Sequence, residues 1–366
     1  MRKQIFLLSS ALALLALASV PAAAQSTSSE EGKTDKNWSA PETPWGDPDL
    51  QGTWTSDDTW GVPFERPKQY GTRRFLTEDE IQQREKRVEQ SQEFIDKGGP
   101  AHSPAVAELE AKEKGETPPP AQGRYGRGVD AAPVPGHWGE FARRASPLTS
   151  QVMDPEDGHI PPITPEAAKL LAEKQEMRRK QDSYVDWSLY DRCITRGIAG
   201  SIIPVIYGNG LEIVQAPGYV SIRYEMVHDV RIIPLGDKLE HAGSGYRSYM
   251  GDAIGHWEGN TLVVDTTNFL GKTAIGVNGD FGPPTSEALH TTERFTRTGT
   301  NTIDYKMTVD DPFTYTAPWS YEFPITHEAG YQLFEYACHE GNMAMRNMLS
   351  TARMEEAKKA AAAAKQ

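Results

Sequence analysis

The chain has 366 residues, with 51 acidic and 38 basic side chains and a formal net charge of −13. An acidic surface repels phosphate backbones and anionic lipid headgroups, so this balance disfavours nucleic acids and peripheral membrane binding. The sequence contains no internal repeat that would indicate a solenoid or a propeller.

The first 24 residues have the features of a secretory signal peptide. Arg2 and Lys3 give a positive start, residues 5–20 are apolar, and three alanines at 22–24 form a small-residue cleavage site. No later stretch is apolar for long enough to cross a bilayer. We therefore expect a periplasmic protein without stable membrane insertion, and a retained N-terminal anchor is the alternative.

The sequence predicts a disordered leader, two helices before residue 200 and a helical tail at the C-terminus. Residues 25–40, dominated by Ser, Thr, Glu and Lys, predict a disordered leader. Thr77 with Glu80 three positions later predicts a capping box, and Thr164 before a proline predicts a second helix start. Residues 354–366 predict a helical tail that frays.

From about residue 200 the apolar side chains recur at every second position, which is typical of β-strands. Tight turns separate these segments and no helix intervenes, which predicts an antiparallel meander closed into a calycin-like barrel. We expect a single, mainly β domain over residues 41–353, decorated by peripheral helices and long loops. The predicted strands cover residues 51–55, 219–226, 230–235, 261–269, 289–297, 302–309, 319–325 and 331–338.

The two cysteines of the chain, Cys193 and Cys338, are 145 positions apart. In an oxidising compartment such a pair often forms a disulfide, and two buried free thiols are the alternative. A thiolate zinc site lacks ligands, and the histidines do not follow the HxH or HExxH spacing. The sequence therefore predicts no metal site.

The stretch FEYACHEGNMAM, residues 334–345, is the most chemically dense part of the chain. We predict a strand that ends at Cys338 and a turn that follows it, which places His339 and Glu340 on the rim of the barrel as catalytic candidates beside Tyr336. His228, next to an aspartate between two strands, is a further candidate base, although a simple turn explains the same pattern.

Other polar residues interrupt the predicted strands. Arg223 and Glu225 lie opposite an apolar face, so they line either a cavity or the outer surface. Asp265 lies in the middle of a strand and needs a hydrogen-bonding or cationic partner if it is buried. His290 and Arg294 share one face of a later strand, which favours a salt-bridged sheet surface.

Eight motifs in order resemble a family of exported bacterial proteins: PWGDPDLQGTW, FLTEDE, DPEDGHIPPITPEA, YDRCITRG, a segment from NGLEIV to VRIIPL, GDAIGHWEGNTLVVDTTNF, a segment from ERFTRTG to TAPW, and YACHEGN. The resemblance covers roughly residues 40–353. It implies catabolism of lignin-derived aromatic dimers by lyase-type removal of a side-chain carbon. The matching positions are Arg192, Arg196, Glu225, His228, Asp229, Arg231, His256, Asp265, Asn268, Glu293, Arg294, Tyr336, His339, Glu340 and Asn342. The loop from Gly123 to Pro147 is less typical of the family.

We therefore expect a periplasmic lyase that removes a side-chain carbon from a phenolic dimer by decarboxylation or deformylation. The catalytic candidates are His339, His228, Glu340 and Tyr336. The expected substrate-binding residues are Arg196, Arg231, Arg223, Glu225, Asp265 and Asn268. Since the chain has no nucleotide or flavin fingerprint, the chemistry is expected to need no cofactor.

Two other functions are compatible with the same residues. A polysaccharide lyase or glycosidase would combine the rim carboxylates with aromatic platforms such as Trp257 and Trp319. A lipocalin-like binding protein would hold an apolar ligand inside the barrel and would not need His339.

Overall fold

The computed structural model describes residues 38–96, 142–205, 207–276, 279, 282–328 and 330–364. The predicted signal peptide and almost all of the predicted leader lie outside these residues, and so does the side chain of His228. In the described part of the chain, every helix is too short or too polar to cross a membrane.

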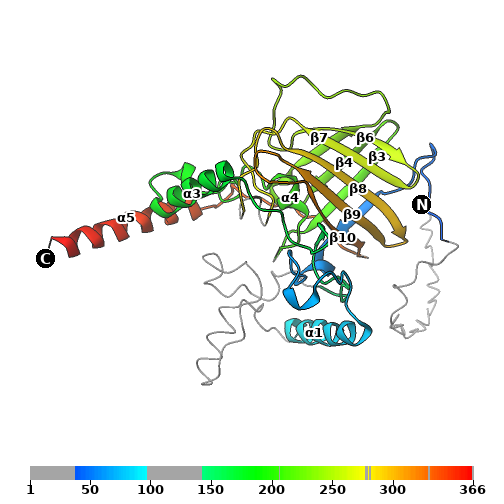
Figure 1. Ribbon diagram of the computed structural model, residues 1–366, viewed down its shortest axis with the longest axis horizontal. Helices are drawn as coiled ribbons and strands as arrows, with labels where there is room; N and C mark the ends of the chain where they lie inside the picture. Colours follow the sequence, from blue (N-terminus) through cyan, green and yellow to red (C-terminus); the bar gives the residue numbers. More distant parts are fainter. Residues whose placement is uncertain are drawn as a thin grey trace, which may run out of the picture. The chain divides into compact units, whose positions relative to one another are not determined.

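The strands form one antiparallel sheet that curves into a nearly closed barrel, as the alternation of apolar residues predicts (Figure 1). A short strand, β2 (Val152–Asp154), also pairs with β10. Along the sheet the order is β5 (Val230–Pro234), β4 (Tyr219–Tyr224), β3 (Gly210–Ala216), β1 (Gly52–Thr55), β10 (Trp319–His327), β9 (Thr302–Asp310), β8 (His290–Gly299), β7 (Thr261–Thr267) and β6 (Asp252–Glu258).

The two ends of this order, β5 and β6, meet at a seam. Leu235 and Gly255 form a parallel bridge, and the amide of Gly236 donates to the carbonyl of Gly255 at 2.9 Å. A side chain at Gly255 would place its Cβ 2.9 Å from Leu235 and 3.1 Å from Ile233. The absence of a side chain at this position therefore allows the edges to approach closely.

The helices agree with the capping signals. The backbone amide of Thr77 donates to Glu80 at 2.8 Å before α1 (Glu78–Asp96), and Thr164 Oγ1 accepts from the amide of Ala167 at 3.1 Å before α3 (Pro165–Lys180). The C-terminal helix, α5 (Ala344–Ala363), has no buried residue. The remaining helical segments are α4 (Gly197–Ile202), η1 (Asp57–Thr59), η2 (Lys68–Tyr70), η4 (Tyr184–Asp186) and η5 (Met226–His228).

Two predicted strands differ in kind from the structure at their ends or throughout. Tyr224 is the last residue of β4, and Met226 already begins η5. The prediction of a strand over residues 331–338 is wrong, because this segment is irregular. A strand needs a free neighbouring edge, and β10 is already paired with β9, β1 and β2.

Aromatic and aliphatic side chains fill the inside of the barrel. On β9, Ile303, Tyr305, Met307 and Val309 are each 0% exposed. The ring of Tyr305 lies 5.0 Å from that of Phe295 and 5.5 Å from that of Phe323, measured between centroids. The barrel interior is therefore a packed core along these strands.

Candidate functional site

The segment that follows β10 packs against the rest of the domain, and we call residues 330–342 the strap. Cys338 of the strap forms a disulfide with Cys193, so the bonded alternative is the one the structure shows. Asn342 donates from Nδ2 to the sulfur of Cys193 at 3.2 Å and accepts from the amide of Ala344 at 2.9 Å. The disulfide and this amide therefore fix the far end of the strap.

The near end of the strap forms one wall of a groove with a volume of about 290 Å³. Its aromatic members are Tyr331 and Phe334, and the Phe334 side chain is strongly exposed. The charged members are Arg143 and Glu328, which form an ion pair, and Glu225. The groove thus combines flat apolar surfaces with carboxylates and a guanidinium, as small-molecule sites commonly do.

Glu225, directly after β4, is the central polar group of the groove. Its Oε2 accepts a hydrogen bond from the Tyr331 hydroxyl at 2.5 Å and one from the amide of Gly210 at 3.3 Å. A Cβ on Gly210 would lie 2.6 Å from Leu333 and 2.7 Å from both Glu225 and Tyr331. Because Gly210 has no side chain, the strap can lie directly against the start of β3.

Three phenols and an arginine form a cluster next to the disulfide. The Tyr190 hydroxyl lies 3.3 Å from the hydroxyls of Tyr207 and Tyr336, and the Arg196 guanidinium lies 5.5 Å from the Tyr190 ring centroid. Burial raises the pKa of Tyr190 and also that of Tyr336. Tyr190 and Tyr336 therefore stay neutral over the physiological range, so Tyr336 acts here as a hydrogen-bonding group.

The remaining predicted catalytic residues do not meet in one place. His339 and Glu340 are exposed, and neither side chain has a hydrogen bond or ion pair within the described chain. The backbone of His228 belongs to η5, and the neighbouring Asp229 accepts from Thr195 Oγ1 at 2.7 Å. A rim site built from His339 and Glu340 is therefore not assembled in this structure.

Of the three arginines predicted to bind substrate, two are buried and one lies on the outer surface in an ion pair. Arg231 is 4% exposed, and its Nη2 lies 2.6 Å from Glu293 inside the barrel. Burial lowers the pKa of Arg231, but Glu293 and Tyr224 outweigh that effect and keep the guanidinium charged. Arg196 is 1% exposed, and Arg223 lies on the outer surface in a 3.1 Å ion pair with Glu212.

Asp265 lies on the outer face of the sheet and bridges two histidines, which answers its predicted need for a partner. Its Oδ2 is 2.5 Å from Nε2 of His290, and its Oδ1 is 2.8 Å from Nε2 of His241. Asn268 donates to the carbonyl of Ala242 at 2.9 Å, beside this group. As the sequence predicts, Arg294 is also part of a salt-bridged surface, through Glu258 at 2.7 Å.

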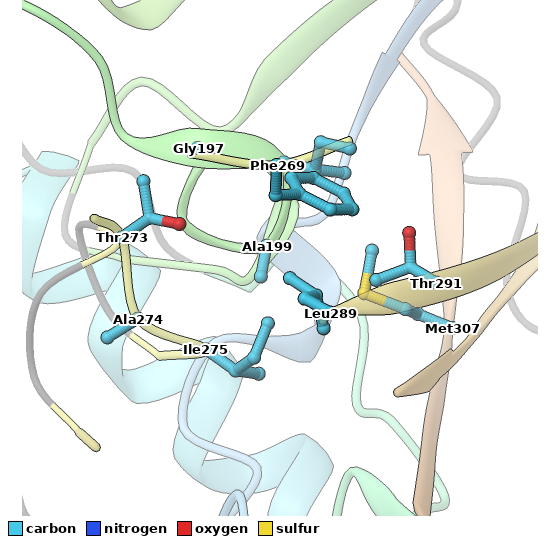
Figure 2. Close-up of a pocket in the computed structure, with 10 residues that line it drawn as sticks. Gly197, Ala199, Phe269, Thr273, Ala274, Ile275, Leu289, Thr291 and Met307 are labelled. Atoms are coloured by element: carbon cyan, nitrogen blue, oxygen red, sulfur yellow. The ribbon is translucent and has the colours of Figure 1, made fainter. Parts of the chain in front are cut away.

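A much smaller cavity of about 10 Å³ lies between α4 and the start of β8 (Figure 2). Leu289, Ile275 and Phe269 line it, together with the hydroxyl-bearing Thr291. A volume of about 10–15 Å³ holds one water molecule. This cavity is too small for an organic substrate, so the groove at Glu225 is the better candidate.

Sequence reasoning selected Glu225 but missed the residues that surround it. Arg143 and Glu328 reach the groove from segments 82 and 103 positions away from Glu225, and Tyr331 and Phe334 come from the wrongly predicted strand. Among the described residues, no group of three or more His, Cys, Asp or Glu side chains is arranged to hold a metal ion.

Comparison of the chain with protein-family models, with curated proteins and with solved structures finds no match.

Proposed function

We propose that the protein is a cofactor-free lyase that removes a side-chain carbon from a small phenolic compound of the lignin-derived dimer type, bound in the groove at Glu225. The observation that carries the proposal is the Glu225 carboxylate in a groove that Tyr331 and Phe334 also line, where it already accepts a hydrogen bond from the Tyr331 phenol. The sequence motifs supply the class of substrate, and the groove supplies residues that suit it.

The groove suits an aromatic ligand in size and in chemistry. Its volume of about 290 Å³ is close to the lower end of small-molecule sites, which measure roughly 300–1,000 Å³. A substrate phenol can take the place of the Tyr331 hydroxyl on the Glu225 carboxylate. Phe334 and the ring of Tyr331 then provide apolar contact for the substrate ring.

The reaction consists of proton transfers, one C–O cleavage and one C–C cleavage. Glu225 takes the proton of the substrate phenol, and the phenolate expels a benzylic ether oxygen, which gives a quinone methide. The hydroxymethyl O–H then gives its proton to the expelled oxygen anion, and the electrons of its carbon–carbon bond re-form the phenolate and a new C=C bond. The products are formaldehyde and a stilbene, so electrons balance without an oxidant. A side-chain carboxylate would leave as carbon dioxide in the same way.

Arg143 is the guanidinium best placed for an anionic part of the substrate. Arg196 and Arg231, which the resemblance implied for this role, are both buried. Arg143 lines the groove with a side chain that is 62% exposed and pairs with Glu328. A carboxylate or phenolate on the ligand would displace Glu328 and form a charge-assisted hydrogen bond with Arg143.

The described residues favour the lyase over its two rivals. Of the two expected sugar platforms, Trp319 is 0% exposed and Trp257 is partly buried against the core. Side chains occupy the barrel interior where a lipocalin-like protein would hold its ligand. Both rivals therefore lose a feature on which they depended.

To test the proposal, the purified protein is incubated with phenylcoumaran-type dimers in the presence and absence of a chelator. The release of formaldehyde, carbon dioxide and stilbene is measured. We expect product from the wild-type protein in both conditions. Glu225→Gln should reduce kcat by about 10²-fold, within the range for a lost general base. Glu212→Gln on the outer face of β3 is the matched control and should leave kcat unchanged. If no product forms, or if both variants lose activity alike, the proposal is wrong.

A further inference from the structure

A chain of alternating aspartates and histidines lies on the outer face of β6, β7 and β8. Asp252 Oδ2 is 3.3 Å from His241 Nδ1, His241 Nε2 is 2.8 Å from Asp265, and the other oxygen of Asp265 is 2.5 Å from His290 Nε2. These side chains are partly exposed, between 21% and 42%. This group, which we call the Asp–His array, is separate from the groove at Glu225.

His241 is the member that does not belong to a strand. It lies in residues 235–251, the crossover that connects β5 to β6. The amide of Ala242 also donates to Asp252 at 2.6 Å, and Asn268 donates to the carbonyl of Ala242 at 2.9 Å. The array therefore attaches the middle of the crossover to the sheet, while residues 243–246 beyond it are exposed.

The hydrogen bonds of the array depend on the charge of the histidines. A neutral imidazole donates from one nitrogen only, whereas an imidazolium donates from both. Both nitrogens of His241 face carboxylate oxygens, so both contacts are hydrogen bonds only when the ring is protonated. Loss of that proton turns one donor into a lone pair that faces a carboxylate.

We propose that Asp252, His241, Asp265 and His290 form a pH-sensitive attachment that holds the crossover on the sheet in mild acid and releases it in mild base. The other groups that face the array are Asp310 on β9, opposite His290 in the register, and Asn268 after β7. With both histidines protonated, two positive charges balance Asp252 and Asp265. Deprotonation leaves these carboxylates uncompensated beside Asp310.

The pKa shifts of His290 and Asp265 agree with attachment in mild acid and release in mild base. The hydrogen bond to Asp265 raises the pKa of His290 above 6.5, so its stabilisation is complete below that pH and disappears as the pH rises through the raised value. Burial raises the pKa of Asp265, but its bonds to His290 and His241 outweigh this and hold the pKa below 3.8. The contact between His290 and Asp265 is therefore complete between these two values.

Hydrogen exchange of the full-length protein at pH 5.5 and pH 8.5, expressed as protection factors, tests the proposal. We expect protection of the crossover amides around Ala242 to decrease by about tenfold from pH 5.5 to pH 8.5. Amides of β8 and β9 should keep their protection, which separates local release from unfolding.

Two variants and a control complete the experiment. His241→Gln should show low crossover protection at both pH values, and Asp265→Asn should do the same if the first variant folds poorly. His256→Gln is the control, because His256 lies on β6 and contacts Glu258 at 3.3 Å outside the array. It should keep the wild-type response. Equal wild-type protection at both pH values, or a control that loses the response, would overturn the proposal.

Discussion

The hydroxyl of Tyr331 lies 2.5 Å from the carboxylate of Glu225, although 106 positions separate the two residues in the sequence. This contact joins the strap to the end of β4 and places a phenol on the carboxylate that we propose as the base. It also means that a phenolic substrate competes with a side chain of the protein.

The first prediction follows from that competition. Tyr331→Phe removes the competing hydroxyl, so a substrate phenol should bind Glu225 more easily. A net hydrogen bond contributes about 1 kcal/mol, so we expect a roughly fivefold lower KM for phenolic substrates. Steady-state kinetics measure the effect, and the O-methylated form of the same compound is the control, because it cannot donate a hydrogen bond and its affinity should not improve. A higher KM for the phenol would argue against the exchange.

The second prediction concerns the disulfide. The Cys193–Cys338 bond closes a loop with a sequence separation of 145. Loop-closure entropy for about 100 residues or more corresponds to about 4–5 kcal/mol, and measured effects are usually smaller. Replacing both cysteines with serine should lower the midpoint of thermal unfolding and raise KM, since the strap forms one wall of the groove.

Calorimetry and kinetics of this double variant are compared with the wild-type protein under reducing and non-reducing conditions. Reductant should reproduce both effects in the wild type and change nothing in the variant. An unchanged KM after loss of the disulfide would show that the strap keeps its place without it.

The sequence was informative where side chains alternate between two environments. In β9, Ile303, Tyr305, Met307 and Val309 face the core, and Asp304 and Lys306 face away from the interior, as their spacing predicts. The same rule failed at Tyr331 to Cys338, because alternation does not reveal whether a neighbouring edge is free. There Tyr331 and Leu333 pack inward, whereas Phe334 is strongly exposed.

The site was less predictable than the fold because tertiary packing, and not local sequence, brings its residues together. Glu225 stands out in the sequence as a polar residue opposite the apolar face of a predicted strand, but Arg143 and Glu328 reach the groove only through the tertiary arrangement. Arg231 shows the opposite error. It has the chemistry of an anion-binding residue, and its burial against Glu293 can be recognised only once the strands are paired.

A third prediction uses the close contact at Gly210. Gly210→Ala would place a Cβ 2.6–2.7 Å from Leu333, Glu225 and Tyr331, so these side chains, two of which belong to the strap, must shift. We expect a several-fold higher KM and a loss of stability of about 1–3 kcal/mol, as for other overpacked sites. Gly299→Ala is the matched control, since its nearest neighbour would be 3.6 Å from the new Cβ. Similar kinetics for the two variants would mean that the strap does not shape the groove.

The last prediction separates a structural role of Arg231 from a role in binding. Glu293 is 0% exposed and lies 2.6 Å from Arg231, which also donates to Tyr224 at 3.2 Å and Thr266 at 3.1 Å. Glu293→Gln removes the charge that compensates the buried guanidinium. It should therefore lower the free energy of unfolding by about 3–5 kcal/mol.

Replacing both partners with apolar residues of similar volume, as in Arg231→Met with Glu293→Leu, should cost less than the single change, because no buried charge is left unpaired. Urea unfolding of Arg231→Met, of Glu293→Leu and of the double variant measures the coupling energy between the two residues. The folded double variant should retain wild-type KM, since Arg231 lies in the core and outside the groove. A large rise in KM with normal stability would instead assign Arg231 to the substrate, as the sequence first suggested.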